Sequence, residues 1–288
     1  MENRYPYIFI FLICTLVVSS SCESQQQAFT SPPGYNLNNP KRFNMPNVLR
    51  EISGIVFYKG TGDTLYAEQD EEGLVFRFKL GDANVQVTRF GKKGDFEDIS
   101  AVNNFIIMLR SDGVLFTFPI TELQKKETDK VKIFEDLLPD GEYEGLASED
   151  MSNKLYVLCK HCRNEKTNKW GGGTILQIDA AGVLTPAGNF ELDIKEIDEI
   201  SHSRKINFHP SALAQNPLTK EWFILSSVNK MLVLADQNWK VKSVYPLNPS
   251  LFVQPEGIAF DRQQNLYISN EQGSSSAATI LLFAHNKN

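Results

Sequence analysis

The chain has 288 residues, of which 42% are hydrophobic and 22% charged, the composition of a globular protein with room for one large domain or two small ones. Its net charge is −6, its pI is near 5.4 and it has no basic block, which argues against nucleic acid as a partner.

The first 21 residues have the pattern of an export signal. Arg4 precedes the apolar run YPYIFIFLICTLVVSS, and small residues stand directly before Cys22. The run is shorter than the roughly 20 apolar residues that a spanning helix needs. Small residues before a cysteine resemble the lipobox of bacterial lipoproteins, although Ser19 stands where leucine is usual. The resemblance implies that Cys22 is lipidated and becomes the first mature residue.

The next segment, ESQQQAFTSPPGYNLNNP, is polar, contains Pro and Gly, and is typical of a tether. We therefore divide the chain into a lipoprotein signal peptide at 1–21, a flexible tether at 22–34 and a folded domain at 35–288. The lipid anchor at Cys22 is expected to hold the domain outside the cytoplasm on a bacterial membrane, with the outer membrane favoured.

A three-residue pattern recurs through the domain. Ser or Glu is followed by Gly or Ala and then by a branched apolar residue, starting at residues 53, 100, 144, 211 and 256. Successive starts lie 47, 44, 67 and 45 residues apart, and three of these intervals match a β-propeller blade of about 40 to 50 residues. Small residues suit innermost strands, where blades crowd around the axis.

Strand-like runs accompany each start, as four-stranded blades require. In chain order they are EISGIVFY, DTLYAEQ, GLVFRFKL and NVQVTRF; FEDISAV, NFIIMLR, GVLFTFP and KVKIF; EYEGLAS, KLYVLCK, GTILQID and VLTPAGNF; HPSALAQ, EWFILSS, KMLVLAD and WKVKSVYPL; and PEGIAF, NLYISN and ATILLFAH. The last repeat supplies only three runs. We expect the segment YNLNNPKRFNMP, ahead of the first repeat, to complete it.

The predicted fold is all-β, a single β-propeller of five four-stranded blades whose last blade is closed by an N-terminal strand. A six-bladed propeller is the alternative, with an irregular blade inside the 67-residue interval. The extra residues there, ELDIKEIDEISHSRKINF, favour a charged loop or short helix, and WGGGT at 170–174 is interpreted as a turn. A β-sandwich would not repeat the entrance pattern at near-constant spacing.

Three of the starts resemble those of the SdiA-regulated family of exported bacterial β-propellers. The residues are EISGI at 51–55, EYEGLA at 142–147 and QPEGIAFD at 254–261 with NLYISNE at 265–271. The similarity runs from about Tyr35 to Phe283. It implies fold and location more than activity, with a calcium connection for some members.

In a propeller, the inner strands begin on the face that also carries the turns between second and third strands. Two sets of polar residues should therefore converge there. The strand starts supply Glu51, Glu97, Asp98, Glu142, Glu144, His209 and Glu256, and the turns supply Asp70, Arg110, Lys160, His161, Asn229, Asn270 and Glu271. For ligand contacts we predict Asp70, Arg110, Lys160, Asn270 and Glu271. For a metal site we predict Glu144, Glu256 and Asp98.

Oxygen ligands around a narrow axis are what Ca²⁺ prefers. Glu144 and Glu256 are the best candidates because both stand at the first position of the pattern. The alternative is that these acids cap strands, accept hydrogen bonds from neighbouring blades or are solvated. The chain contains no contiguous D-x-D-x-D-G calcium loop.

The favoured function is a binding module for a small-molecule or protein ligand at the channel face, with Ca²⁺ as its candidate cofactor and with binding favoured over catalysis. The alternative is a calcium-dependent hydrolase of a lactone or phosphoester, in which the metal polarises the ester. Serine at three of the five pattern starts disfavours the hydrolase, and no G-x-S-x-G is present.

Cys159 and Cys162 lie in the motif CKHC, after a strand-like run. Two thiolates cannot form a four-cysteine zinc site, and a redox C-x-x-C is expected at a helix start. In an exported protein we expect a local disulfide. A metal site that recruits His161, His202 or His209 is the alternative.

Overall fold

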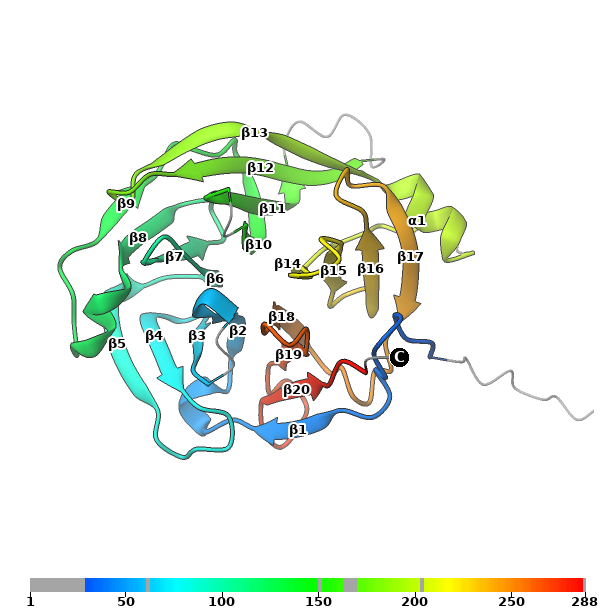
Figure 1. The fold of residues 1–288 in the computed structure, drawn as a ribbon, viewed down its shortest axis with the longest axis horizontal. Helices are drawn as coiled ribbons and strands as arrows, with labels where there is room; N and C mark the ends of the chain where they lie inside the picture. Colours follow the sequence, from blue (N-terminus) through cyan, green and yellow to red (C-terminus); the bar gives the residue numbers. More distant parts are fainter. Residues whose placement is uncertain (1–28, 61–62, 150–151, 163–169, 203–204, 287–288) are drawn as a thin grey trace, which may run out of the picture.

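The structure is a computed structural model that describes residues 29–60, 63–149, 152–162, 170–202 and 205–286. Five sheets surround a common axis, and the strands labelled β2, β6, β10, β14 and β18 lie innermost (Figure 1). The predicted five-bladed propeller is therefore confirmed. The signal peptide, Cys22 and most of the tether lie outside the described residues.

Each blade is an antiparallel sheet of four strands. The first two blades contain β2 (Ile52–Phe57), β3 (Leu65–Gln69), β4 (Glu72–Phe78) and β5 (Gln86–Lys93), then β6 (Phe96–Val102), β7 (Phe105–Arg110), β8 (Leu115–Pro119) and β9 (Lys132–Phe134). The third and fourth contain β10 (Gly141–Glu149), β11 (Lys154–Cys162), β12 (Trp170–Ile178) and β13 (Leu184–Asp193), then β14 (Ala212–Gln215), β15 (Trp222–Ser226), β16 (Met231–Ala235) and β17 (Val241–Pro246). The fifth contains β18 (Pro255–Phe260), β19 (Leu266–Asn270), β20 (Thr279–Phe283) and β1 (Lys41–Asn44). Helix α1 spans Ile194–Ile200, and short 3-10 turns span Asn47–Leu49, Tyr58–Gly60 and Ile120–Gln124.

The ring is closed by the N-terminal strand, as predicted. β1 pairs antiparallel with β20, with Phe43 opposite Ile280 and Lys41 opposite Leu282. The pairing covers one edge of the last blade, which removes an otherwise open row of backbone groups. Tyr35, earlier in the chain, is buried and donates its hydroxyl to the carbonyl of Gln264 at 2.7 Å.

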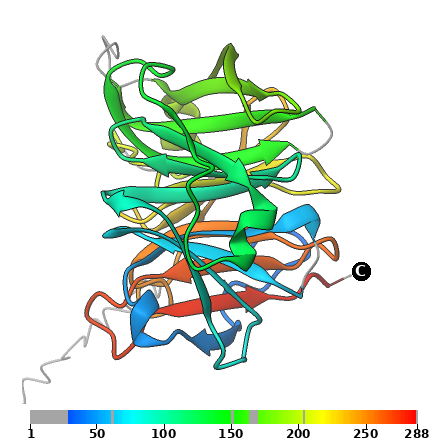
Figure 2. The ribbon, with the colours of Figure 1, turned by 90° about the vertical axis from the view of Figure 1, so that its left-hand side faces the viewer.

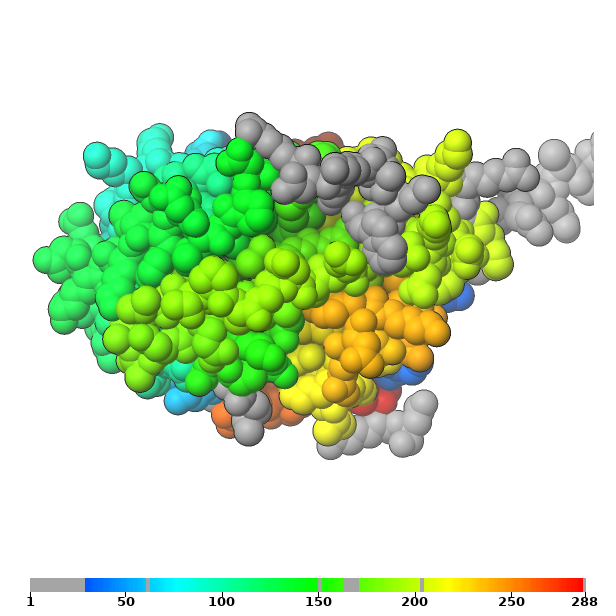
Figure 3. Space-filling view, turned by 90° about the horizontal axis from the view of Figure 1, so that it is seen from above, coloured from blue at the N-terminus to red at the C-terminus, as the bar shows by residue number. Residues whose placement is uncertain are grey.

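Within its described residues, the 67-residue interval holds no sixth blade. It is filled by the long strands β12 and β13 and by α1, whose N-cap Asp193 accepts a hydrogen bond from the Lys195 N–H. The helix packs against β17 on the outer rim, where the Val241 N–H donates to Glu196 at 2.9 Å (Figure 3). The interpretation of WGGGT as a turn is wrong, because these residues begin β12 and pair with β13.

Close packing of inner strands explains the small second residue of the pattern. A Cβ added to Gly54 would overlap Asp98 of the next blade, and one added to Gly257 would overlap the Ser53 carbonyl. One added to Gly145 would lie 2.9 Å from a methyl of Leu213. The neighbouring blade therefore leaves no room for a larger side chain at these three glycines.

Seen from the side, the strands run across the thickness of the ring (Figure 2). We call the face where inner strands begin the entrance face and the one where they end the exit face. Apolar clusters fill the spaces between blades, as where Phe190 of the third blade and Trp239 of the fourth stack with ring centroids 4.0 Å apart. Among the described residues, no helix is long and apolar enough to cross a membrane.

Deletion of residues 23–46 should lower the stability of the mature protein by about 5 kcal/mol or more, because it removes β1 and the buried Tyr35, Leu37 and Met45. Thermal unfolding measures the effect, and deletion of residues 23–28 alone is the control. Equal midpoints for the two deletions would contradict the closing role of β1.

Candidate functional site

We call the residue at which an inner strand enters its blade, predicted to be the first residue of the three-residue pattern, the entrance position. In three blades this residue lies at an irregularity in strand pairing. Pairing shifts by one residue at Glu144 in β10, at Glu256 in β18 and at Glu97 in β6. In the second blade, therefore, Glu97 occupies the entrance position rather than Ser100. Phe96 before Glu97 corresponds to Tyr143 before Glu144, a signal already present in the sequence.

Three entrance glutamates interact across the axis. Burial raises the pKa of Glu256 to about 7, and the negative charge of Glu144 adds to the shift. Burial likewise raises the pKa of Glu97 to about 9, with further contributions from Glu144 and Glu256. Carboxylates that share a partly desolvated space resist ionising together. Glu144 and Glu256 thus lie close enough to influence each other's charge, and their role as metal ligands stays a prediction.

Lys160 already supplies a positive charge to this group. Its Nζ lies 2.5 Å from Glu144 Oε1 and 3.0 Å from Glu142 Oε1. Burial lowers the pKa of Lys160, but hydrogen bonds to the two glutamates outweigh it and raise the pKa overall. Burial still holds the pKa of Glu144 above its ordinary value. Glu144 therefore has a protein cation as its partner.

A second acidic group lies where the first and last blades meet. Glu51, Asp70 and Glu271 each offer a carboxylate oxygen, and these oxygens lie within 4.8 Å of one another. Burial, followed by repulsion from neighbouring carboxylates, raises the pKa of Asp70 to about 6 and that of Glu271 to about 8. Asp70 Oδ1 is buried and has no hydrogen-bond partner among the described residues. We call these three residues the acidic triad.

The triad has dimensions suited to a cation. Calcium binds oxygens at about 2.3 to 2.6 Å, so two ligands of one ion lie at most about 5 Å apart. The triad's oxygens meet that limit. Glu271 is further oriented by Ser53 Oγ at 3.4 Å and by the amide of Gln254. A bound cation would relieve the repulsion that raises these pKa values.

Asp98 has a different environment from the entrance glutamates. Its Oδ1 accepts the N–H of Ile99 at 2.8 Å and its Oδ2 accepts that of Leu146 at 2.6 Å. The side chain is buried and joins the second blade to the third. These backbone bonds occupy both oxygens, so we leave Asp98 out of the proposed cation site.

Two other residues were predicted as ligand contacts: Asn270, which lies beside the triad, and Arg110, which lies apart from it. Asn270 is buried next to Glu271, its amide donates to Thr279 at 3.4 Å, and its Oδ1 has no partner among the described residues. Arg110 is bound by Asp112 at 2.8 Å through two nitrogens and lies over the Phe116 ring. The Asp112 carboxylate, which belongs to the same turn, therefore pairs with the charge of Arg110.

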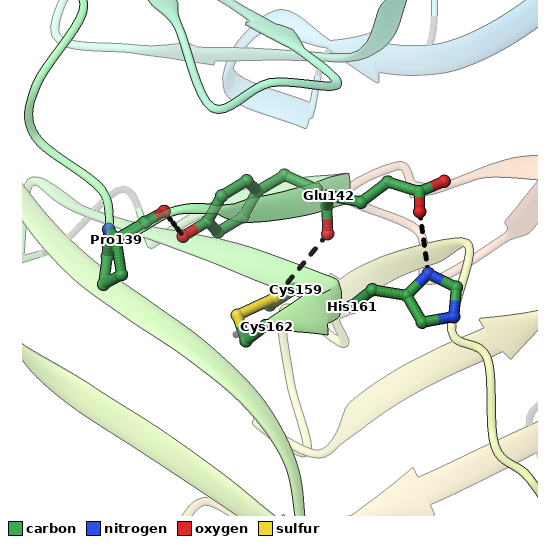
Figure 4. Close-up of a disulfide and its surroundings, with 6 residues drawn as sticks. Pro139, Glu142, Cys159, His161 and Cys162 are labelled. Atoms are coloured by element: carbon green, nitrogen blue, oxygen red, sulfur yellow. Dashed lines mark hydrogen bonds and ion pairs between the residues drawn. A yellow bond between two sulfur atoms is a disulfide. The ribbon is translucent and has the colours of Figure 1, made fainter. Parts of the chain in front are cut away.

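Cys159 and Cys162 form a disulfide within β11 (Figure 4). The two residues between them, Lys160 and His161, contact the entrance acids, with His161 Nδ1 at 2.7 Å from Glu142 Oε2. The His161 ring lies 4.8 Å from that of His209. The disulfide thus holds a short segment that carries a lysine and a histidine over the entrance. With both sulfurs bonded to each other, the cysteines offer no thiolate to a metal.

A sequence profile of the SdiA-regulated family matches residues 30–273, which is most of the chain. The chain belongs to the SdiA-regulated family. The matched region includes the acidic triad and all the entrance glutamates. No protein with a curated description matches the chain significantly in sequence.

Solved structures with the same fold are distant in sequence. A glutaminyl cyclase from Myxococcus xanthus superposes with a TM-score of 0.56 at 11% identity, over 86% of this chain and 96% of that one. Regucalcin from Agrobacterium tumefaciens, a calcium-binding protein, superposes with a TM-score of 0.51 at 11% identity, over 88% and 95%. At these identities the likeness shows the fold alone.

The raised pKa values predict that stability without divalent cations falls as the pH rises. A carboxyl group with a raised pKa in the folded state contributes stability below its ordinary pKa and loses it as the pH passes the raised value. Between pH 5 and pH 8, Glu256, with a pKa of about 7, should account for about 2 kcal/mol. Thermal unfolding in chelator should show the fall, and Glu256→Gln should reduce it. Equal pH dependence in both proteins would contradict the assignment.

Proposed function

We propose that the protein is a cell-envelope lipoprotein whose β-propeller is a binding module that depends on a divalent cation, Ca²⁺ being the best fit. The observation that carries the proposal is the acidic triad, three carboxylates within 4.8 Å at the entrance face. Asp70 Oδ1, buried and without a hydrogen-bond partner among the described residues, adds support, because a buried oxygen without a donor is costly unless a cation or water satisfies it.

The triad would leave part of the coordination shell open. Calcium takes about six to eight oxygen ligands, and three carboxylates supply three of them, or more if bidentate. The remaining positions suit the carbonyl, carboxylate or hydroxyl oxygens of a small molecule or a protein segment. Lys160 and Asn270 lie on the same face and could donate to such a ligand.

Calcium should raise the unfolding temperature of the mature protein. At a hundredfold excess over its Kd, the linkage amounts to about 2.7 kcal/mol, or about 5 to 10 °C for a domain of this size. Glu271→Gln should abolish most of the shift, while Glu191→Gln, on the exposed outer strand β13, should leave it intact. An unmoved wild-type midpoint would contradict the proposal. A shift that survives Glu271→Gln but is lost in Glu256→Gln would move the site to the entrance glutamates.

The path of the chain supports an orientation on the membrane. Near the start of the described chain, Tyr35 bonds to Gln264 and Asn216, which lie in exit-face turns. From Phe29 back to Cys22 the chain can span at most about 25 Å. A lipid at Cys22 would therefore hold the exit face toward the membrane and leave the entrance face pointing away from it.

If Cys22 is lipidated, its substitution should release the protein from membranes. Wild-type protein should sediment with membranes and incorporate a palmitate analogue, while Cys22→Ser should do neither. Cys14→Ser is the matched control and should behave as wild type. Unaltered membrane association and labelling of Cys22→Ser would contradict the anchor.

One observation favours the calcium-dependent hydrolase as a second candidate. His161 is hydrogen-bonded to Glu142 beside the entrance acids, an arrangement that can serve a general base next to a metal. Calcium-dependent hydrolysis of a γ-lactone or a nitrophenyl phosphodiester that is lost in His161→Asn would favour the enzyme. If no hydrolysis is found but calcium still raises the unfolding temperature, the binding module remains the favoured function.

A further inference from the structure

A separate cavity opens at the exit end of the channel. Its volume is about 290 Å³, and all five inner strands line it. A ring of branched apolar side chains forms its deepest level: Ile55, Ile99, Leu146, Leu213 and Ile258. Its lining begins at that ring and includes none of the entrance glutamates or the acidic triad. The cavity is therefore distinct from the proposed cation site.

The rim of this cavity is positively charged. Lys59, Lys220 and Arg262 line it from the first turns of the first, fourth and fifth blades. Within the described part of the chain none of the three forms a salt bridge with a carboxylate. Lys59 Nζ lies 3.5 Å from Asn104 Oδ1 and over the Tyr58 ring, contacts with neutral groups that leave its positive charge unpaired.

The carboxylates at the rim are already occupied. Glu149 Oε2 accepts hydrogen bonds from the hydroxyls of Ser152 and Tyr156. Asp261 is buried and accepts from Asn265 and from the Tyr267 hydroxyl at 3.0 Å. These donors are neutral, so both carboxylates keep their charge, and the mouth carries three cations and two carboxylates, a net positive charge, above the ring of branched residues.

We infer that the exit cavity binds a small aliphatic carboxylate, a medium-chain fatty acid being the class that fits. The apolar chain would lie against the ring of branched residues, since apolar burial favours such contact. The carboxylate would remain at the mouth, within reach of the rim cations. The volume is near the lower end for small-molecule sites, about 300 to 1,000 Å³, which limits the ligand to a short chain.

Calorimetric titration with octanoate tests the inference on the mature protein carrying Cys22→Ser, which lacks the lipid. Octanoate should bind at one site, and 1-octanol, which lacks the charge, should bind at least tenfold more weakly. The double variant Lys220→Gln with Arg262→Gln should weaken octanoate binding at least tenfold. Lys240→Gln, an exposed lysine outside the cavity, should leave it unchanged.

A second variant tests the depth of the site. Ala147→Leu, in the cavity wall, should abolish octanoate binding while circular dichroism and cooperative unfolding show a folded protein. Chelator should have no effect on octanoate affinity. No binding, equal affinity for octanol, or wild-type affinity in the double variant would overturn the inference. Loss of binding in chelator would place the ligand at the entrance instead and would also overturn it.

Discussion

The crowding of five inner strands around one axis is the constraint on which the rest of the structure depends. It leaves room for only the smallest residues at the second position of the three-residue pattern, where Gly54, Gly145 and Gly257 meet the neighbouring blade. It also brings the first positions of different blades into one small space. The residue types at those first positions therefore decide the electrostatics of the whole entrance face.

The entrance face carries more negative charge than its own cations offset. Lys160 compensates Glu144 and Glu142, but the described residues place no salt bridge on Glu97, Asp70, Glu256 or Glu271. Burial and mutual repulsion raise the pKa values of these four groups. Such a face can lower its free energy by holding protons or by binding a cation, and this choice links stability, pH and divalent ions.

Much of the fold could be predicted from the sequence because the repeat is periodic. Spacing gave the blade number, and the three-strand final repeat gave the closing strand β1. The second blade was placed three residues out of register, since Asp98 stands where other blades have Gly or Ala. That exception has a physical reason, because the missing Cβ of Gly54 leaves room for the Asp98 carboxylate.

The convergence of Glu51, Asp70 and Glu271 on the entrance face was predictable from the sequence, but their grouping as one candidate cation site was not. Asp70 and Glu271 belong to turns whose place on the entrance face follows from blade topology. Glu51 lies just outside the repeated triplet, and it approaches Glu271 only because ring closure brings the first and last blades together. A repeat pattern within single blades does not predict which residues of different blades contact one another. The pairing of Arg110 with Asp112, by contrast, is local and could have been read from their spacing.

Proton release on calcium binding tests the central claim most directly. Calorimetric titration of calcium at pH 7 in two buffers of different ionisation enthalpy counts the protons released. If the acidic triad holds the ion, Glu271, with a pKa of about 8, must lose its proton when calcium binds. The account predicts close to one proton released per calcium, with both binding and release lost in Glu271→Gln. Calcium binding without proton release, or none at all, would contradict it.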